Sequence, residues 1–291
     1  FNEQPPRTII GEADTDTREA NALSDDSTGT DEAHPSRVDT GGTPPAIPGA
    51  PAVDVSYDGL EKGSDPIGRG GEAVVYAARL NTESGEQYLA IKEPDQRDTV
   101  RAETVERFLD EADTWAALAD HDYVVDIVGS GSQPLPWIAM EYMDGGDLQS
   151  RLGSLPFDQA VWTMLSITKA IRYAHNRGVR HYDLKPQNVL FRSTEGGYWD
   201  VPKIADWGLA ERALRSGTPN DGMTPASAAP EQLFEEYGEP DHQTDIYQLG
   251  LLCYELFTGE HPYDGDQTKV CSVPLPPPGE VRPSVPDAVD T

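Results

Sequence analysis

The spacing of hydrophobic and polar positions changes along this chain, and the change predicts two kinds of structure. From Tyr57 onward apolar residues first recur at every second position, which is typical of strands. Residues 74–80 and 88–92 predict two strands, and the polar segment 81–87 between them, which contains Gly85, predicts a hairpin turn. Two further strands are predicted at 124–128 and 137–141.

Later in the chain the apolar spacing lengthens to the helical period. A first helix is predicted from an apolar stripe with i, i+3, i+4 and i+7 spacing, made of Val105, Phe108, Leu109, Ala112, Trp115, Ala116 and Ala119. Two more helices are predicted at 157–176 and 244–258, and the proline-rich segment 274–286 is expected to be extended. We therefore expect an α+β fold, with a small sheet-rich lobe over 56–143 and a larger helical lobe over 144–291.

The first 55 residues have a different character. They contain 11 acidic residues, three arginines and seven prolines, but eight large apolar residues. Ordering a backbone costs roughly 1–2 kcal/mol per residue, and this segment has little apolar surface to offset that cost. We interpret residues 1–55 as a disordered acidic linker, and its Gly/Pro-rich run 41–49 as a spacer that follows a further domain before Phe1.

Composition restricts the possible partners. The 291 residues include 22 Lys+Arg and 51 Asp+Glu, with a formal net charge of −29 at pH 7. Such a surface repels nucleic acid and anionic lipid, so phosphate chemistry here has to be local and metal-assisted. No apolar run of about 18 residues predicts a membrane span. The two cysteines, Cys253 and Cys271, indicate no disulfide framework and favour a reducing, cytoplasmic location.

The basic residues are unevenly divided, because only six of the 22 are lysines. Few lysines and abundant aspartate are typical of proteins from salt-in halophiles. Our hypothesis is that high salt screens the repulsion among surface carboxylates, since the Debye length falls to about 3 Å at 1 M salt. The alternative is an acidic protein from a mesophile.

Residues 67–76 form a glycine turn that runs into a β-branched strand, Val74-Val75-Tyr76. A dinucleotide-binding fold needs a helix directly after its glycines, so this context argues against that fold. Glycines let a backbone approach phosphates closely. Taken alone, the segment is better interpreted as a plain hairpin.

Lys92 ends the apolar strand that follows. A lysine in this position needs an anionic partner, because burying it unpaired costs several kcal/mol. Glu111 on the next predicted helix can supply that partner. The alternative is that Glu111 lies on a solvated helix face with Asp110 and Asp113.

The strongest chemical signal is the segment 181–190, His-Tyr-Asp-Leu-Lys-Pro-Gln-Asn-Val-Leu, followed by Asp-Trp-Gly at 206–208. With these motifs the chain resembles the protein kinases, specifically the eukaryotic-like Ser/Thr kinases of bacteria and archaea. The glycine loop, Ala-Ile-Lys at 90–92, the helix glutamate, these two motifs and Ala-Pro-Glu at 229–231 occur in the family's order. The resemblance covers residues 57–286 and implies a bilobal fold and a signalling transferase that uses ATP and Mg²⁺.

The resemblance implies a role for each polar residue. Asp183 would accept the proton of a substrate hydroxyl, and Lys185 would hold the phosphoryl group being transferred. Asn188 and Asp206 would bind Mg²⁺ through hard oxygen ligands. Lys92, fixed by Glu111, would hold the α- and β-phosphates. The substrate would be a protein Ser or Thr.

The resemblance also implies an adenine site between the lobes, with the hinge at 141–143 binding the adenine edge through its backbone. The residues expected to contact nucleotide are Ile67, Gly68, Gly70, Gly71, Val75, Ala90, Lys92, Met140, Glu141, Met143 and Leu190. Core packing alone would also account for the apolar members of this set.

Lys185-Pro186 and Thr224-Pro225 favour Ser/Thr over Tyr specificity, since in the family the Thr224 hydroxyl bridges the catalytic aspartate and lysine. The alternative is that Thr224 merely starts a turn. Tyr182 replaces an arginine that normally pairs with a phosphorylated activation loop, so we expect activity without phosphorylation between residues 206 and 231, although Thr218 is a candidate site.

Three smaller departures remain: Ala73 stands at the third glycine, Trp207 replaces Phe, and the chain ends at Thr291, where the family has two more helices. We expect Trp207 to pack against the helix that bears Glu111. We also expect an incomplete helical lobe that exposes apolar surface from residues 244–258.

Two rival functions stay open, a pseudokinase that binds nucleotide without transfer and a phosphotransferase acting on small molecules. The second usually lacks the Ala-Pro-Glu segment and a lysine at the position of Lys185.

Overall fold

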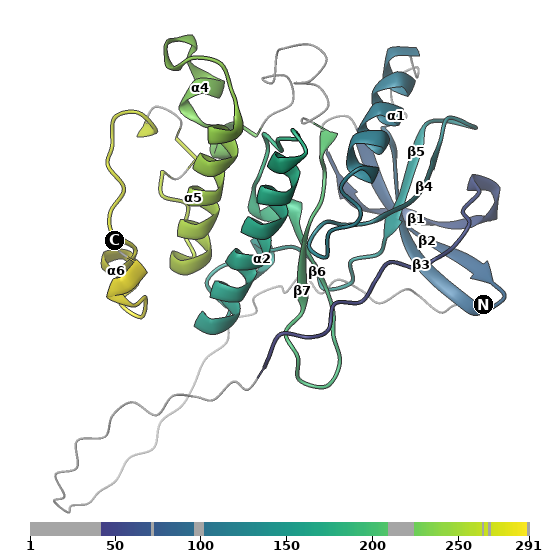
Figure 1. The fold of residues 1–291 in the computed structure, drawn as a ribbon, viewed down its shortest axis with the longest axis horizontal. Coiled ribbons are helices and arrows are strands. Elements are labelled where there is room, and N and C mark those ends of the chain that lie inside the picture. The colour runs from purple at the N-terminus through teal and green to yellow at the C-terminus, as the bar shows by residue number, and fades with distance from the viewer. Residues whose placement is uncertain are drawn as a thin grey trace, which may run out of the picture. The chain divides into compact units, whose positions relative to one another are not determined.

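The computed structural model describes residues 42–70, 73–95, 102–208, 224–263, 265–266 and 269–289 (Figure 1). Gly71, Thr218 and residues 1–41 lie outside these ranges, so the predictions made for them remain predictions.

The first half folds into a five-stranded antiparallel sheet with the order β1-β2-β3-β5-β4. The strands are β1 (Leu60–Arg69), β2 (Ala73–Thr82), β3 (Gly85–Pro94), β4 (Ile127–Gly131) and β5 (Trp137–Glu141). The predicted hairpin is present between β2 and β3, and Gly85 takes the positive φ of +121° that favours glycine in such a turn. The strand at 137–141 has the predicted limits.

For the strand predicted at 124–128, the predicted start is wrong by three residues, because β4 starts at Ile127. Val124 and Val125 are fully buried and precede the strand. The carbonyl oxygen of Val125 accepts a hydrogen bond from Nε1 of Trp115, and its N–H donates to the carbonyl oxygen of Ile204. Two adjacent apolar residues therefore belong to the core between the sheet and the helices, and they do not start an alternating strand.

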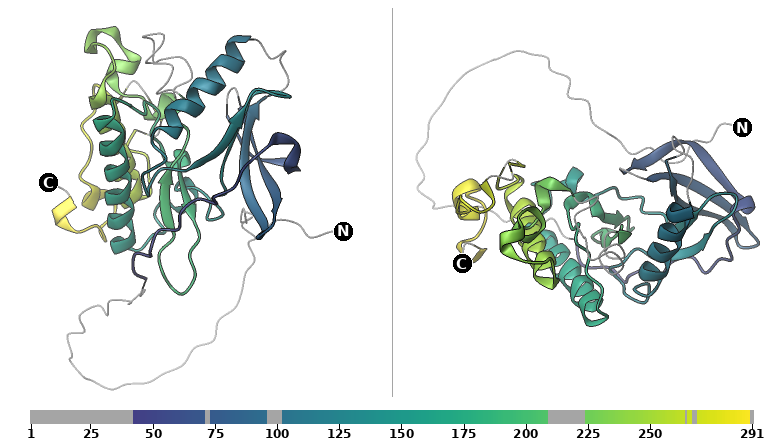
Figure 2. Two further views of the ribbon diagram at one scale, coloured as in Figure 1. Left: turned by 45° about the vertical axis from the view of Figure 1, so that its right-hand side comes forward. Right: turned by 90° about the horizontal axis from the view of Figure 1, so that it is seen from above.

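Helix α1 (Ala102–Ala116) packs against β4 and β5 and buries Phe108, Glu111, Ala112 and Trp115 (Figure 2). The second half is helical. Helix α2 (Phe157–Asn176) lies beside α5 (His242–Thr258), and the hairpin of β6 (Val189–Arg192) and β7 (Val201–Ile204) packs on α2 (Figure 1). Among the described residues, the short helix α4 (Pro230–Leu233) precedes α5, and the short helix α6 (Pro278–Val281) follows it. The predicted α+β fold, an antiparallel-sheet lobe with a helical lobe, is confirmed.

Two details of the helical part differ from expectation. The segment 274–286 is not extended throughout, because α6 forms one helical turn within it. Exposed apolar surface was expected from α5, but Leu249, Leu252 and Leu256 are buried there, and Ile246 is 51% exposed. Exposed apolar side chains also lie on α2, at Phe157, Val161 and Leu165. In the described residues, no helix is long and apolar enough to cross a membrane.

Residues 42–59 contact both the hairpin and the sheet. The backbone N–H of Trp199, between β6 and β7, donates to the carbonyl oxygen of Thr43 (3.0 Å). Val55 packs near Trp137, and the Tyr57 hydroxyl donates to Oε1 of Glu93 (2.8 Å). This segment includes the end of the predicted linker, and residues 42–55 have no regular secondary structure.

Candidate active site

Lys92 lies between two carboxylates. Its Nζ atom, on β3, lies 2.5 Å from Oε1 of Glu111 on α1 and 2.8 Å from Oδ1 of Asp206. Burial alone would lower the pKa of Lys92, but the charges of Asp206 and Glu111 outweigh it and raise that pKa above its ordinary value. The predicted pairing of Glu111 with Lys92 is present, and the alternative of a solvated Glu111 is wrong, since Glu111 is buried.

Asp206 follows β7 by two residues and has a φ of +64°, a left-handed conformation that is uncommon for non-glycine residues. Its side chain is 49% exposed. The ammonium of Lys92 lowers the pKa of Asp206 to about 2, so this carboxylate is ionised at neutral pH. Gly208 lies close by: a Cβ atom there would come within 3.1 Å of the Glu111 carboxylate, which would have to shift by a few tenths of an ångström.

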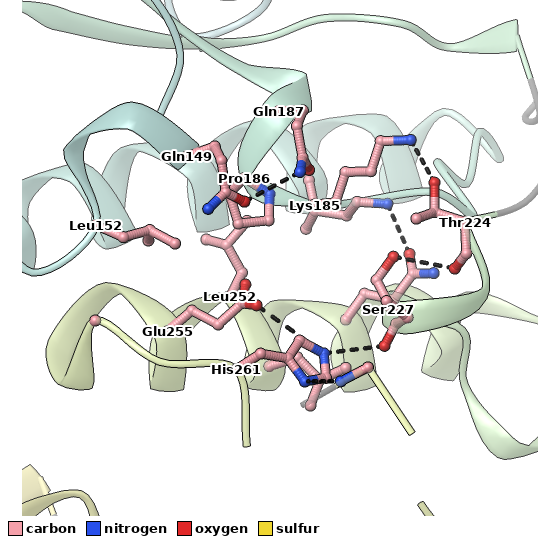
Figure 3. Close-up of a pocket in the computed structure, with 16 residues that line it drawn as sticks. Gln149, Leu152, Lys185, Pro186, Gln187, Thr224, Ser227, Leu252, Glu255 and His261 are labelled. Atoms are coloured by element: carbon pink, nitrogen blue, oxygen red, sulfur yellow. Dashed lines mark hydrogen bonds and ion pairs between the residues drawn. The ribbon is translucent and has the colours of Figure 1, made fainter. Parts of the chain in front are cut away.

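A second group of polar side chains surrounds Asp183. Nζ of Lys185 lies 2.6 Å from Oδ2 of Asp183 and also donates to the hydroxyl of Thr224 (Figure 3). The backbone N–H of Thr224 donates to Oδ1 of Asp183 (2.9 Å), and Nδ2 of Asn188 donates to the carbonyl oxygen of Asp183 (2.8 Å). Thr224 therefore joins the aspartate through its backbone and the lysine through its hydroxyl. Thr224 also precedes a 3-10 turn, so it both bridges the aspartate and the lysine and starts a turn.

The two groups are connected through Ala205. Its N–H donates to the carbonyl oxygen of Asn188 (2.9 Å), and its own carbonyl oxygen lies 3.1 Å from Nε2 of His181. Trp207 is fully buried, with its ring 4.7 Å from that of His181, and its expected packing against α1 stays a prediction. The polar positions predicted to act together thus form two groups of direct contacts, which the backbone of Ala205 connects.

The backbone around Asp183 is held by buried polar residues that the sequence reasoning missed. Asp245 on α5 accepts hydrogen bonds from the backbone N–H groups of His181 (2.9 Å) and Tyr182 (2.7 Å). Gln248 accepts one from Leu184 and donates to the carbonyl oxygen of Tyr182. Tyr182 itself has a φ of +63°. The available signal was the occurrence of polar residues at core-facing positions of an apolar helix.

The apolar positions predicted to contact adenine lie on five strands and just after β5, and most of them belong to or pack against one core cluster. Ala90 and Met140 are buried in one core cluster, and Val75, Met143 and Leu190 pack against it while partly exposed. Ile67 is 50% exposed and is not part of that cluster. Gly68 lies opposite Val75 in the pairing of β1 with β2, and the N–H of Gly70 donates to the carbonyl oxygen of Ala73.

A cavity of about 250 Å³ adjoins Lys185 and Thr224 (Figure 3). Its walls include Gln149, Glu255 and His261. Nε2 of His261 lies 3.0 Å from the carbonyl oxygen of Ala226, so this histidine ties α5's C-terminal loop to the segment after Thr224. Burial raises the pKa of Glu255 to about 7.

Comparison with known proteins agrees with this geometry. A family model described as the protein kinase domain matches residues 62–273. A probable serine/threonine-protein kinase from Clostridium perfringens is 32% identical over 236 residues, which cover 77% of this chain and 33% of that protein. The DNA damage-responsive serine/threonine-protein kinase of Deinococcus radiodurans is 32% identical, over 77% of this chain and 34% of its own length.

A serine/threonine-protein kinase from Myxococcus xanthus is also 32% identical, over 77% of this chain and 33% of its length. The chain thus spans about a third of the length of these curated relatives. Since the family model covers most of the chain and its motif residues lie together in the fold, the chain belongs to the protein kinase domain family.

Proposed function

We propose that this chain is an ATP-dependent Ser/Thr protein kinase that transfers the γ-phosphoryl group of Mg-ATP to a protein hydroxyl. The observation that carries the proposal is the continuous set of contacts that joins Lys92, Asp206, Asn188, Asp183 and Lys185. Two carboxylates, an amide and two ammonium groups in one place are suited to positioning a triphosphate and an acceptor hydroxyl.

Each group has a defined part in the proposed transfer. Asp183 accepts the proton of the substrate hydroxyl, whose oxygen forms a bond to the γ-phosphorus while the bond from that phosphorus to the β-phosphate oxygen breaks and ADP leaves. Lys185 offsets the charge on the transferred group. Thr224 supports both residues, because its backbone N–H contacts Asp183 and its hydroxyl contacts Lys185.

The donor set fits Mg²⁺. Nδ2 of Asn188 is engaged by Asp183, which leaves the amide oxygen for a cation, and the ionised Asp206 supplies a second hard oxygen ligand. When bound, Mg²⁺ would neutralise charge on the β- and γ-phosphates. Lys92 holds the α- and β-phosphates in this proposal, with Glu111 fixing its position.

A protein acceptor is favoured over a small molecule by the surroundings of Thr224. The cavity beside Thr224 and Lys185 is lined by the segment after Thr224 and by α5, which supply room for the side chain of an extended peptide. The same segment leads into Ala229-Pro230-Glu231, and Oε1 of Glu231 accepts a hydrogen bond from Thr244 at the start of α5 (2.6 Å).

The test is to incubate the protein with peptide substrates, Mg²⁺ and ATP labelled at the γ-phosphate, beside an Asp183→Asn variant. We expect label on Ser or Thr with the natural chain and none with the variant, while Asp158→Asn, on an exposed position of α2, stays active. Label on a small molecule alone would indicate a phosphotransferase. ATP binding with no transfer would indicate a pseudokinase. Either result would replace this proposal.

A further inference from the structure

Four charged side chains form a buried cluster where β5 ends. Nζ of Lys203 on β7 lies 2.5 Å from Oε1 of Glu141, the last residue of β5, and 3.2 Å from Oδ2 of Asp126. Oε2 of Glu141 lies 3.0 Å from Nη1 of Arg192 on β6. The cluster contains two cations and two carboxylates, so its charges balance.

The centre of the cluster is sealed from solvent. The side chains of Lys203 and Glu141 are 1% and 0% exposed, whereas Asp126 and Arg192 reach the rim. Oε1 of Glu141 also accepts a hydrogen bond from the backbone N–H of Asp126 (2.9 Å). Every oxygen of this carboxylate therefore has a partner, and removing one cation would leave a buried charge without full compensation.

The cluster connects two parts of the proposed nucleotide site. Glu141 begins the segment whose backbone is expected to bind the adenine edge. Leu190 pairs directly with Lys203 across the hairpin, and directly paired residues of antiparallel strands share a face of the sheet. The same hairpin begins directly after Asn188, and β7 leads into Asp206.

We propose that Lys203 and Arg192 are positioning residues for nucleotide binding, which hold the end of β5 in register with the hairpin that carries the proposed Mg²⁺ ligands. This inference rests on the proposed function, because it concerns how that same site binds ATP. Neither cation is expected to touch the nucleotide. They act through Glu141, whose side chain is fixed in the cluster and whose backbone begins the segment expected to bind the adenine edge.

A purely structural role and a positioning role make different predictions. Replacing a buried ion pair often changes stability with no selective effect on one substrate. A positioning residue for ATP changes the affinity for ATP and leaves the affinity for the peptide unchanged. The measurement that separates these roles is therefore the KM for ATP against the KM for peptide, together with direct nucleotide binding.

The experiment compares Lys203→Met, Lys203→Arg and Arg192→Gln with Lys169→Met, a lysine on the exposed side of α2. Binding of a fluorescent ATP analogue is measured with Mg²⁺, because this readout does not need catalysis. We expect Lys203→Met to weaken binding and to raise the KM for ATP by about tenfold, with the peptide KM within about twofold. Lys203→Arg should recover most of the loss, and Lys169→Met should behave as the natural chain.

Arg192→Gln, at the rim, is the milder test if Lys203→Met does not fold, and we expect it to raise the KM for ATP by about threefold. A folded Lys203→Met or Arg192→Gln that binds the analogue as tightly as the natural chain overturns the inference. So does an equal rise in both KM values. If the natural chain binds no ATP analogue, the proposed function itself fails, so the two failures are distinguishable.

Discussion

Oε1 of Glu111 accepts a hydrogen bond from Nζ of Lys92 at 2.5 Å, and this contact joins α1 to β3. Lys92 has a second partner in Asp206. The position of the ammonium is thus set by two carboxylates, that of Glu111 on α1 and that of Asp206 after β7. Losing one carboxylate would let the ammonium move toward the one that remains.

Glu111→Gln should therefore reduce activity without unfolding the protein. Lys92 keeps Asp206 as a partner, but it is drawn toward that carboxylate and away from the proposed phosphate position. We expect kcat/KM for ATP to fall by about 10- to 100-fold. Steady-state assays at varied ATP check this, with Asp113→Asn on the exposed side of α1 as the control. An unchanged kcat/KM would show that the ion pair has no part in catalysis.

Thr224 offers a test in which only a side-chain hydroxyl is removed. Its hydroxyl accepts from Lys185, whereas its backbone N–H contacts Asp183 whatever the side chain. Thr224→Val removes the hydroxyl and keeps the shape, so we expect kcat to fall about tenfold or more because Lys185 loses a fixed partner. Thr224→Ser keeps the hydroxyl and should retain most of the activity. Equal activity of the Val and Ser variants would contradict this role.

The fold was predictable where apolar spacing dominates. Helix α2 has the predicted limits, and so does β5, because their patterns are regular and their ends are marked. Strand β1 was not predicted, since most of its residues are exposed and its sequence, which contains Gly63 and Pro66, is polar. The β6–β7 hairpin also escaped prediction, because strands of four residues are too short to show a period.

The candidate site was predictable at the residues that the motifs name, since the resemblance supplies them one by one. The buried residues that hold the site in place were not predictable in this way. Asp245 and Lys203 are polar residues inside the core, and single-sequence reasoning places polar side chains at the surface. Their partners lie far away in the chain: Lys203 pairs with Glu141, and Asp245 with the backbone of Tyr182. A polar residue at a core-facing helix position, such as Asp245, signals burial, but spacing along the chain does not identify its distant partner.

Activity without activation-loop phosphorylation remains a prediction, because Thr218 lies outside the described residues. The structure supplies one reason to expect it. The hydroxyl of Tyr182 donates to the carbonyl oxygen of Pro240 (3.3 Å), so this side chain is held by a contact that needs no phosphate. Thr218→Ala and phosphatase-treated protein should keep activity within about twofold of the untreated chain. Complete loss in Thr218→Ala, restored by Thr218→Glu, would contradict the prediction.

The acidic composition leads to a prediction about salt. With a formal net charge of −29, repulsion among carboxylates opposes the compact state at low ionic strength. Raising KCl from 0.1 M to about 2 M should therefore raise the midpoint of thermal unfolding and the activity, since the Debye length falls from about 10 Å to below 3 Å. Unfolding curves over a KCl series check this. A protein that is fully folded and active in dilute buffer would remove the hypothesis of adaptation to high salt.

Glu255 predicts a specific dependence of stability on pH. Burial raises the pKa of this carboxyl from 4.5 to about 7, so the folded chain holds the proton more tightly than the unfolded chain does. Below pH 4.5 the Glu255 carboxyl is protonated in both the folded and the unfolded chain, so it does not lower the free energy of unfolding. As the pH rises from 4.5 to 7 the free energy of unfolding falls, and above pH 7 the full penalty is present, on the order of 3 kcal/mol as an upper bound.

Glu255→Gln removes this penalty because the amide does not titrate. We expect the variant to be more stable than the natural chain at pH 8 and nearly equal to it at pH 4.5, so the difference in free energy of unfolding grows across that interval. Urea unfolding of both chains at several pH values measures the difference, and Glu260→Gln, an exposed neighbour, is the control that leaves it unchanged. Parallel stability curves for Glu255→Gln and the natural chain would mean that this carboxyl is hydrated in solution and that its burial does not control its protonation.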